Sequence, residues 1–173
     1  LVMILSIFTT MSTTIQGQDV DLNDKLKGYY NFEDVEGNTV KNLVGQEYQG
    51  TLIGNNVSIK DSKFGKSLHF SDGEEGHMRI NNVINANAGD FSISLWYKYD
   101  TAFDRGIKKT VLLQQSGSGR TLLSLKADNK YSSYVNGMDV DSDKSVDVNK
   151  WQHVTYVYTP ATKKITYYIN GQF

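Results

Sequence analysis

Acidic residues at alternate positions are the first candidates for chemistry, because strand spacing would place both side chains of such a pair on one face. Asp34 with Glu36 and Asp139 with Asp141 have this spacing. Two carboxyl groups on either side of a glycosidic bond can hydrolyse it, one as the acid and the other as the base or nucleophile. Both pairs lie among turn residues, so we expect solvated acids rather than a catalytic pair.

Histidine and serine residues could support nucleophilic catalysis or metal binding. The sequence contains no Gly-x-Ser-x-Gly turn to present a nucleophile, so a Ser-His-Asp triad is not indicated. His69 and His77 flank a polar turn too loosely for a zinc site, and the chain has no Cys. His153 alternates with Trp151 and Thr155, which is typical of a packed structural residue in a strand.

Aromatic side chains are the most plentiful candidates for ligand contact. Sugar rings have apolar C–H faces and hydroxyl rims, so a sugar site pairs an aromatic platform with polar groups. Trp96 and Tyr156 are the platforms we select, although strand alternation turns about half of such residues inward. Arg79 or Arg120 could hold an acidic sugar by a bidentate contact, with a surface ion pair as the alternative. The possible platforms are Trp96, Tyr97, Tyr131, Tyr134, Tyr156, Tyr158, Tyr167 and Tyr168.

The charge of the chain limits its partners. It has 19 acidic and 18 basic residues and a formal charge of −1, so no long-range field attracts nucleic acid or an anionic membrane. Its length of 173 residues fits a single domain with a sizeable core. We therefore expect one globular domain that does not bind nucleic acid.

Strand patterns dominate from Lys27 onward, where apolar and polar residues alternate between Gly and Asn turns. The clearest run is GDFSISLWYKY, one face of which carries Phe91, Ile93, Leu95 and Tyr97. No stretch shows a clean helical repeat. The sequence therefore predicts an all-β, antiparallel two-sheet jelly-roll sandwich. We expect Phe91, Ile93, Leu95 and Val154 to lie between the sheets.

The N-terminal segment has the order of an export signal. The apolar run LVMILSIF precedes small and polar residues, which predicts a truncated signal peptide over 1–17 with cleavage after Gly17. A short leader over 18–26 would follow. The alternative is a buried edge strand, because an apolar run of about 8 residues is too short to span a bilayer. We expect a chain exported from a bacterium, secreted or held at the cell surface.

Several segments resemble one known family. YYNFEDVEGNTVKN, KFGKSLHFSDG, GDFSISLWYK and NKWQHVTYVYTPATKKITYYINGQ follow one another as in the laminin-G-like 3 group of the concanavalin A-like lectin/glucanase superfamily. The resemblance runs from about Lys27 to Gly171. It implies a jelly roll of two antiparallel sheets, of the kind appended to secreted glycosidases, sialidases and adhesins. Family members commonly continue for a few strands past Tyr-x-Asn-Gly, so we expect the domain over 27–173 to be incomplete at its C-terminal end.

The resemblance also implies a structural calcium ion, which takes about six to eight oxygen ligands. Glu33, Asn42 and Asp72 hold the matching positions, with ordinary turn and capping roles as the alternative. The first segment departs from the family pattern at these positions. A looser alternative is the acidic stretch of Asp139, Asp141, Asp143 and Asp147. We interpret that stretch as a solvated loop, because it lacks the Gly and distal Glu of an EF-hand.

These observations favour a non-catalytic module that binds glycans or glycoconjugates, or acts as a spacer. The resemblance implies a place at the N-terminus of a larger secreted carbohydrate-active enzyme, such as a sialidase, with a catalytic domain downstream. Glucanases of the superfamily typically carry Glu-x-Asp-x-x-Glu on one strand, which neither 90–100 nor 151–168 contains. An adhesion module that binds protein is the first alternative and would expose a large apolar patch. A glycosidase is the second.

Overall fold

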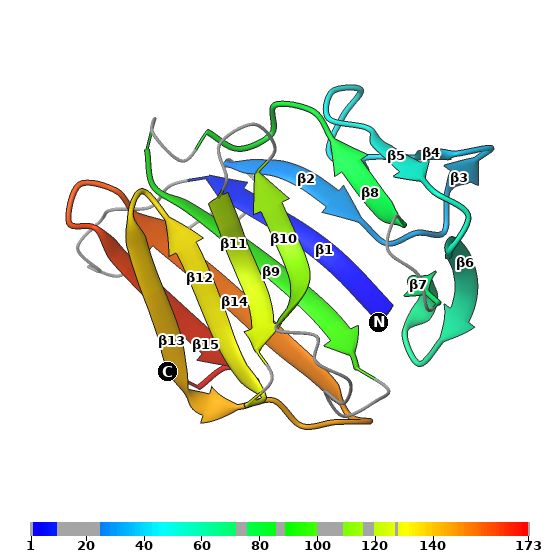
Figure 1. Cartoon of the computed structure of the whole chain (residues 1–173). Coiled ribbons are helices and arrows are strands. Elements are labelled where there is room, and N and C mark those ends of the chain that lie inside the picture. The colour runs from blue at the N-terminus through cyan, green and yellow to red at the C-terminus, as the bar shows by residue number, and fades with distance from the viewer. Residues whose placement is uncertain are drawn as a thin grey trace.

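A computed structural model of the 173-residue chain describes residues 2–9, 25–71, 76–85, 89–99, 109–115, 120–126 and 128–172. Within these ranges the chain forms strands joined by turns and contains no helix (Figure 1). It follows that no helix in the described ranges is long and apolar enough to cross a membrane. The prediction of an all-β fold is confirmed.

The strands of the described residues form three antiparallel sheets. The main sheet follows the order β15 (Lys164–Ile169), β14 (Trp151–Thr159), β9 (Phe91–Lys98), β1 (Val2–Thr9), β7 (Gly65–Phe70), β6 (Val57–Ser62), with β2 (Leu26–Tyr30) also paired to β1. The second contains β10 (Lys109–Gln115), β11 (Arg120–Lys126), β12 (Lys130–Val135) and β13 (Met138–Ser145). The third contains β3 (Val35–Glu36), β4 (Thr39–Val40), β5 (Gly50–Ile53) and β8 (His77–Ile80).

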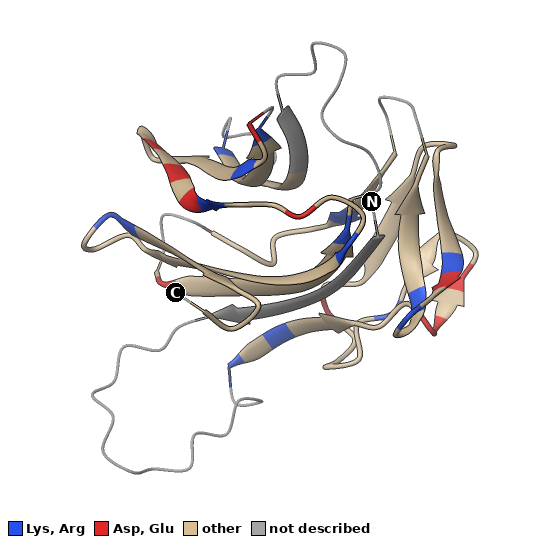
Figure 2. Cartoon of the chain, turned by 90° about the horizontal axis from the view of Figure 1, so that it is seen from below, with Lys and Arg blue, Asp and Glu red and all other residues tan. Residues whose placement is uncertain are grey.

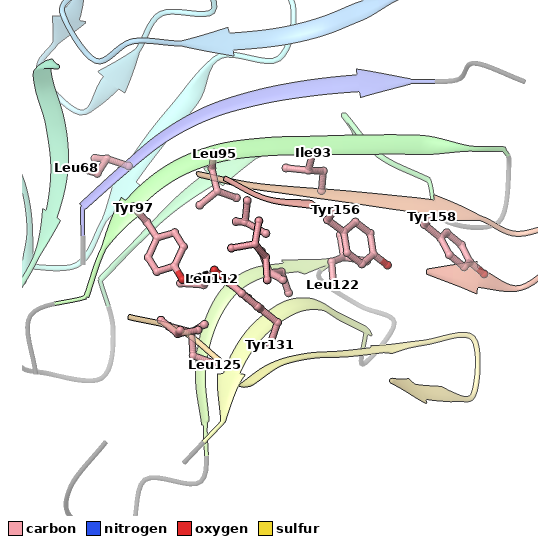
Figure 3. Close-up of a cluster of buried hydrophobic side chains, with 14 of the residues drawn as sticks. Leu68, Ile93, Leu95, Tyr97, Leu112, Leu122, Leu125, Tyr131, Tyr156 and Tyr158 are labelled. Atoms are coloured by element: carbon pink, nitrogen blue, oxygen red, sulfur yellow. Dashed lines mark hydrogen bonds between the residues drawn. The ribbon is translucent and has the colours of Figure 1, made fainter. Parts of the chain in front are cut away.

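The core lies between the main and second sheets, which face each other in Figure 1. Residues of β9 alternate strictly between buried and partly exposed, as expected for a strand with one face in the core. Leu95 and Tyr97 point from β9 toward Leu125 and Tyr131 of the second sheet (Figure 3). The four residues predicted to lie between the sheets are at most 2% exposed: Phe91, Ile93, Leu95 and Val154. That prediction is confirmed, and the small third sheet extends the predicted sandwich.

The core contains tyrosine hydroxyls as well as apolar groups. The hydroxyls of Tyr97 and Tyr131 lie 2.5 Å apart, so they satisfy each other where the two sheets meet. Tyr167 donates a hydrogen bond of 2.6 Å to Ser133. Burial raises the pKa of Tyr131 and of Tyr167 to about 12, because the charged phenolate loses solvation there. The two sheets are thus held together by paired hydroxyls within an apolar layer.

The N-terminal segment forms an interior strand of the main sheet. The backbone of β1 pairs with β9 over its whole length, and its other side pairs with β7 and β2. The alternative considered for this segment, an edge strand, therefore has the right secondary structure but the wrong place in the sheet. Removal of 1–17 by an export peptidase is a separate matter of processing, and it stays a prediction.

Asp139, Asp141 and Asp143 of the acidic stretch lie in a strand rather than in the solvated loop we expected, whereas Asp147 lies in the exposed loop that follows. The strand is β13, which pairs with β12 across a turn at Asn136 and Gly137. Both turn residues have positive φ, 50° and 79°, the conformation that Asn and Gly tolerate in a tight hairpin. The acids remain exposed, and Asp141 pairs with Lys126 at 2.5 Å. Tertiary pairing has overridden the low strand propensity of Asp.

Candidate functional site

The face of the main sheet that points away from the core carries an unusual set of side chains. Alternation along β9 places Trp96 on this face, because its neighbours Leu95 and Tyr97 are buried in the core. The register of β9 with β14 sets Trp96 opposite His153 and Lys98 opposite Trp151. Directly opposed residues of antiparallel strands share a face, so these side chains form one surface.

Four rings gather at one end of this face, and we call Phe64, Trp96, Trp151 and His153 the outer aromatic patch. The ring centroid of Phe64 lies 4.8 Å from that of Trp96 and 5.4 Å from that of Trp151. The Trp96 and His153 centroids are 5.2 Å apart. These tilted and edge-on arrangements fall in the range that aromatic pairs prefer. Phe64 is the outermost ring, with 40% of its surface exposed.

Phe64 reaches the patch from the turn between β6 and β7. Gly65 in this turn has φ of +92°, and an added Cβ would lie 2.2 Å from the Glu33 carboxylate. Glu33 accepts a hydrogen bond of 2.6 Å from the backbone N–H of Lys66. The Ser62 hydroxyl donates to the Gly65 carbonyl at 2.8 Å, which closes the turn. The backbone that carries Phe64 is therefore fixed by specific contacts on both sides.

Beside the patch, polar groups cross three strands, and we call Ser94, Thr155 and Tyr168 the hydroxyl row. The Ser94 hydroxyl lies 2.7 Å from His153 Nε2 and 3.2 Å from the Thr155 hydroxyl. Tyr168 of β15 pairs with Thr155 in register and is 38% exposed. Burial lowers the pKa of His153, so its imidazole is neutral at neutral pH and can donate at one nitrogen and accept at the other.

The groups on this surface are suited to stacking and hydrogen bonding. The three strands β9, β14 and β15 contain no Asp or Glu, so these strands supply none of the carboxylates that glycosidic hydrolysis requires. The Lys63 ammonium lies 5.1 Å from the Phe64 centroid, within reach of a cation–π contact. Elsewhere the charges are mixed in sign along the described chain (Figure 2), with exposed pairs such as Lys66 with Asp61 at 2.6 Å.

The structure separates the three residues expected to bind carbohydrate. Trp96 lies in the outer aromatic patch, whereas Arg79 is an exposed residue of β8 in the third sheet. Tyr156 is fully buried, with its ring packed between Phe91 and Tyr167. The expectation for Tyr156 is corrected on this ground: a ring between the two sheets cannot contact a glycan.

The residues expected to bind calcium serve different contacts. Glu33 accepts a hydrogen bond from the backbone N–H of Lys66 at the start of β7, while Asn42 is buried and hydrogen-bonded to β2 and to its own loop. Asp72 lies outside the described residues. Within the described ranges no group of three or more acidic or His residues could hold a metal ion. The expectation of calcium stays a prediction as far as it depends on Asp72.

Three members of the outer aromatic patch were not selected as site residues from the sequence: Phe64, Trp151, and His153, which was interpreted as a packed structural residue. Trp151 alternates with His153, which does indicate that both rings share one face. Only the register between β9 and β14 brings that face beside Trp96. Phe64 is distant in sequence and its exposed position in a turn carries no pattern, so its contact with Trp96 could not be inferred.

Comparison with known proteins gives one match. A family model described as the concanavalin A-like lectin/glucanases superfamily, the laminin-G-like 3 family, matches residues 72–173. This range covers the strands from β8 to β15 and more than half of the chain. No curated protein and no solved structure matches. The resemblance drawn from the sequence is confirmed over this range, and the chain belongs to the laminin-G-like 3 family of the concanavalin A-like lectin/glucanase superfamily.

Proposed function

We propose that this module binds glycans through the outer aromatic patch and the hydroxyl row, and that it does not cleave them. One observation carries the proposal: exposed and half-buried rings lie directly beside a line of hydroxyl groups on the solvent side of the main sheet. The rings offer flat surfaces for the C–H face of a sugar. The hydroxyls and the neutral His153 can exchange hydrogen bonds with sugar hydroxyls.

The composition of the surface supports an uncharged or weakly charged sugar as the ligand. The Lys63 ammonium lies over the Phe64 ring, and Lys98 stands opposite Trp151 in register. Ser94 and Thr155 are small, so they leave room above the strands for a ring that stacks on Trp96. The lack of carboxylates on β9, β14 and β15 supports binding without hydrolysis.

In this proposal the module belongs to a larger secreted protein of a bacterium, and a carbohydrate-active enzyme such as a sialidase is the partner domain we favour. The family membership and the apolar N-terminal run support this context. A module that holds the glycan raises the effective concentration of an attached enzyme at its substrate. It therefore needs only weak affinity to be useful.

The test is a glycan array with the purified chain, followed by titration calorimetry on the best ligand. Phe64→Ala and Trp151→Ala should each weaken binding about tenfold or more, the scale of a central aromatic contact. Tyr134→Ala is the matched control, because Tyr134 is 46% exposed but belongs to β12 of the second sheet. Its affinity should equal that of the parent chain.

Two outcomes would overturn the proposal. One is binding that persists in both patch variants but is lost in the Tyr134 variant, which would move the site to the second sheet. The other is release of reducing sugar from the array ligand by the purified chain, which would show hydrolysis. Melting curves of all variants distinguish lost binding from lost folding.

One observation favours the alternative of an adhesion module that binds protein. Leu43 and Val44 are 43% and 44% exposed at a loop tip, and Leu43 is hydrogen-bonded through its backbone to Tyr29, itself 38% exposed. Exposed apolar side chains of this kind suit protein contact. Replacing Leu43 and Val44 with Ser should leave glycan binding unchanged, and a loss of adhesion to a cell surface in that variant would support the alternative.

A further inference from the structure

The loop that follows β4 is built around the side chain of Asn42, which is only 7% exposed. Its amide oxygen accepts hydrogen bonds from the backbone N–H groups of Tyr29 at 3.0 Å and Val44 at 3.1 Å. Its amide nitrogen donates to the carbonyls of Lys27 at 3.0 Å and Glu47 at 2.9 Å. All four hydrogen-bonding positions of this carboxamide are therefore in use.

A second carboxamide completes the same loop. Gln49 accepts a hydrogen bond of 2.9 Å from the backbone N–H of Asn42. Its amide nitrogen donates to the carbonyls of Gly45 and Gln46, each at 3.0 Å. Four backbone carbonyls of two segments thus point at two amide groups, one from Asn42 and one from Gln49.

Converging carbonyl oxygens are also what calcium requires, so the donor set can be compared with that of a metal site. In this loop the groups that face the carbonyls are N–H donors, and they take the place a cation would need. The orientation of Asn42 is fixed by its partners, because exchanging its oxygen and nitrogen would set oxygen against two carbonyls and nitrogen against two N–H groups. The Asn42 oxygen has no lone pair left for a metal. The loop does not fit a calcium ion.

We propose that the carboxamides of Asn42 and Gln49 organise the 42–49 loop in place of a metal ion, so that its native structure is independent of calcium. The proposal concerns this loop alone and does not depend on the proposed function. The Tyr30 hydroxyl adds a further tie by donating to the carbonyl of Tyr48, a residue with φ of 57°. The loop is thus held from the sheet below as well as from within, and it presents Leu43 and Val44 at its surface.

The test is thermal melting of the 173-residue chain in millimolar calcium and in excess chelator. The parent chain should melt at the same temperature in both. Asn42→Asp in chelator should lower the melting temperature by roughly 4–10 °C, because a carboxylate keeps the size of the amide but cannot donate to two buried carbonyls. Gln49→Ala should give a smaller loss, and it serves as the second variant if Asn42→Asp does not fold. Gln46→Ala is the control, because Gln46 is an exposed residue of the same loop that contributes only its backbone carbonyl.

Each outcome bears on the proposal. A calcium-dependent rise of the parent melting temperature that disappears in the Gln49 variant would overturn it, because the metal would then bind in this loop. A rise that persists unchanged in that variant would place calcium elsewhere and support it. An Asn42→Asp chain as stable in chelator as the parent would also overturn it, since the amide donors would then contribute nothing.

Discussion

The two faces of the β9–β14 pair use the same strands for different purposes. On the core face, Leu95 and Val154 stand opposite each other and are at most 1% exposed between the two sheets. On the outer face, Trp96 and His153 stand opposite each other and are partly exposed. Neighbouring residues of either strand therefore have different roles: one packs in the core, and the next lies on the candidate binding face.

The comparison shows how much freedom each face has. A core residue is constrained by the close packing of two sheets, so its volume and shape decide stability. An outer residue contacts only its neighbours on the same sheet and, here, the β6–β7 turn that carries Phe64. Substitutions on the two faces should therefore differ in kind: core changes should affect folding, and outer changes should affect binding.

The largest effect is expected on the core face. Leu95→Ala should lower the free energy of unfolding by about 2–5 kcal/mol, because it leaves a cavity between the sheets that the surroundings only partly fill. Urea denaturation followed by tryptophan fluorescence measures this loss. The folded fraction should still bind glycan with the affinity of the parent. A nearly neutral substitution would mean that Leu95 does not pack between the sheets.

The next effect tests the hydroxyls buried on the core side. Desolvation raises the pKa of Tyr131 and Tyr167 to about 12 and also raises that of Tyr97. An unfolded tyrosine ionises near pH 10, so between about pH 10 and 12 the unfolded chain loses protons that the folded chain keeps. The contribution of these tyrosines to the free energy of unfolding is fully present below pH 10, and it decreases as the pH rises from about 10 to 12.

Urea midpoints measured at pH 8, 10 and 11, together with the phenolate absorbance of the native chain, check this expectation. In Tyr131→Phe the alkaline loss should be shallower, because one buried phenol is gone, although the variant starts from a lower stability. A native absorbance titration complete near pH 10 would show that the tyrosines are solvated, and the picture of paired hydroxyls between the sheets would then be wrong.

A smaller change in stability is expected on the outer face, with a larger one in binding. Trp96→Ala should cost about 1 kcal/mol of stability through its lost contacts with Phe64 and His153, and should weaken glycan binding about tenfold or more. Calorimetric titration and melting of the same sample separate the two. Trp96→Phe keeps a ring and should recover part of the affinity. If the free energy of unfolding falls as far as in Leu95→Ala, Trp96 is a packing residue. The proposed glycan site would then lack the ring on which the sugar stacks.

Much of the core face could be predicted from the sequence. Period-2 alternation identified the buried residues of β9, because a strand with one buried face must alternate. The same rule of alternation would also have placed Tyr156 in the core. With Val154 assigned to the core, a residue two positions later has to lie on the same side. The choice of Tyr156 as a sugar platform ignored that parity.

The outer face could be predicted only in part, because it depends on contacts between distant segments. The identity of Trp96 as an outward ring follows from alternation, but the register that sets it opposite His153 does not. Asn42 was selected as a calcium ligand, whereas the structure engages its amide in four hydrogen bonds to backbone groups. Its role depends on backbone groups of β2 and of its own loop, whose positions no local pattern specifies.

The smallest expected effect concerns His153, which joins the outer aromatic patch to the hydroxyl row. Burial lowers its pKa, so the folded chain holds the imidazole neutral at a pH where the unfolded chain has already taken up a proton. The groups around it are uncharged: Ser94 at Nε2, the Trp96 ring, and Asn170, which bonds its backbone. Lys98, the nearest cation in register, stands opposite Trp151.

The contribution of His153 to stability is therefore full above about pH 6.5 and is lost as the pH falls below it. Between pH 7.5 and 5 the urea midpoint should fall, and in His153→Gln it should fall less, by a difference on the order of a few tenths molar. The Gln variant keeps a polar group beside Ser94 but cannot be protonated. Equal losses in both chains would mean that His153 is solvated, and the outer face would then lack the half-buried polar link that joins its rings to its hydroxyls.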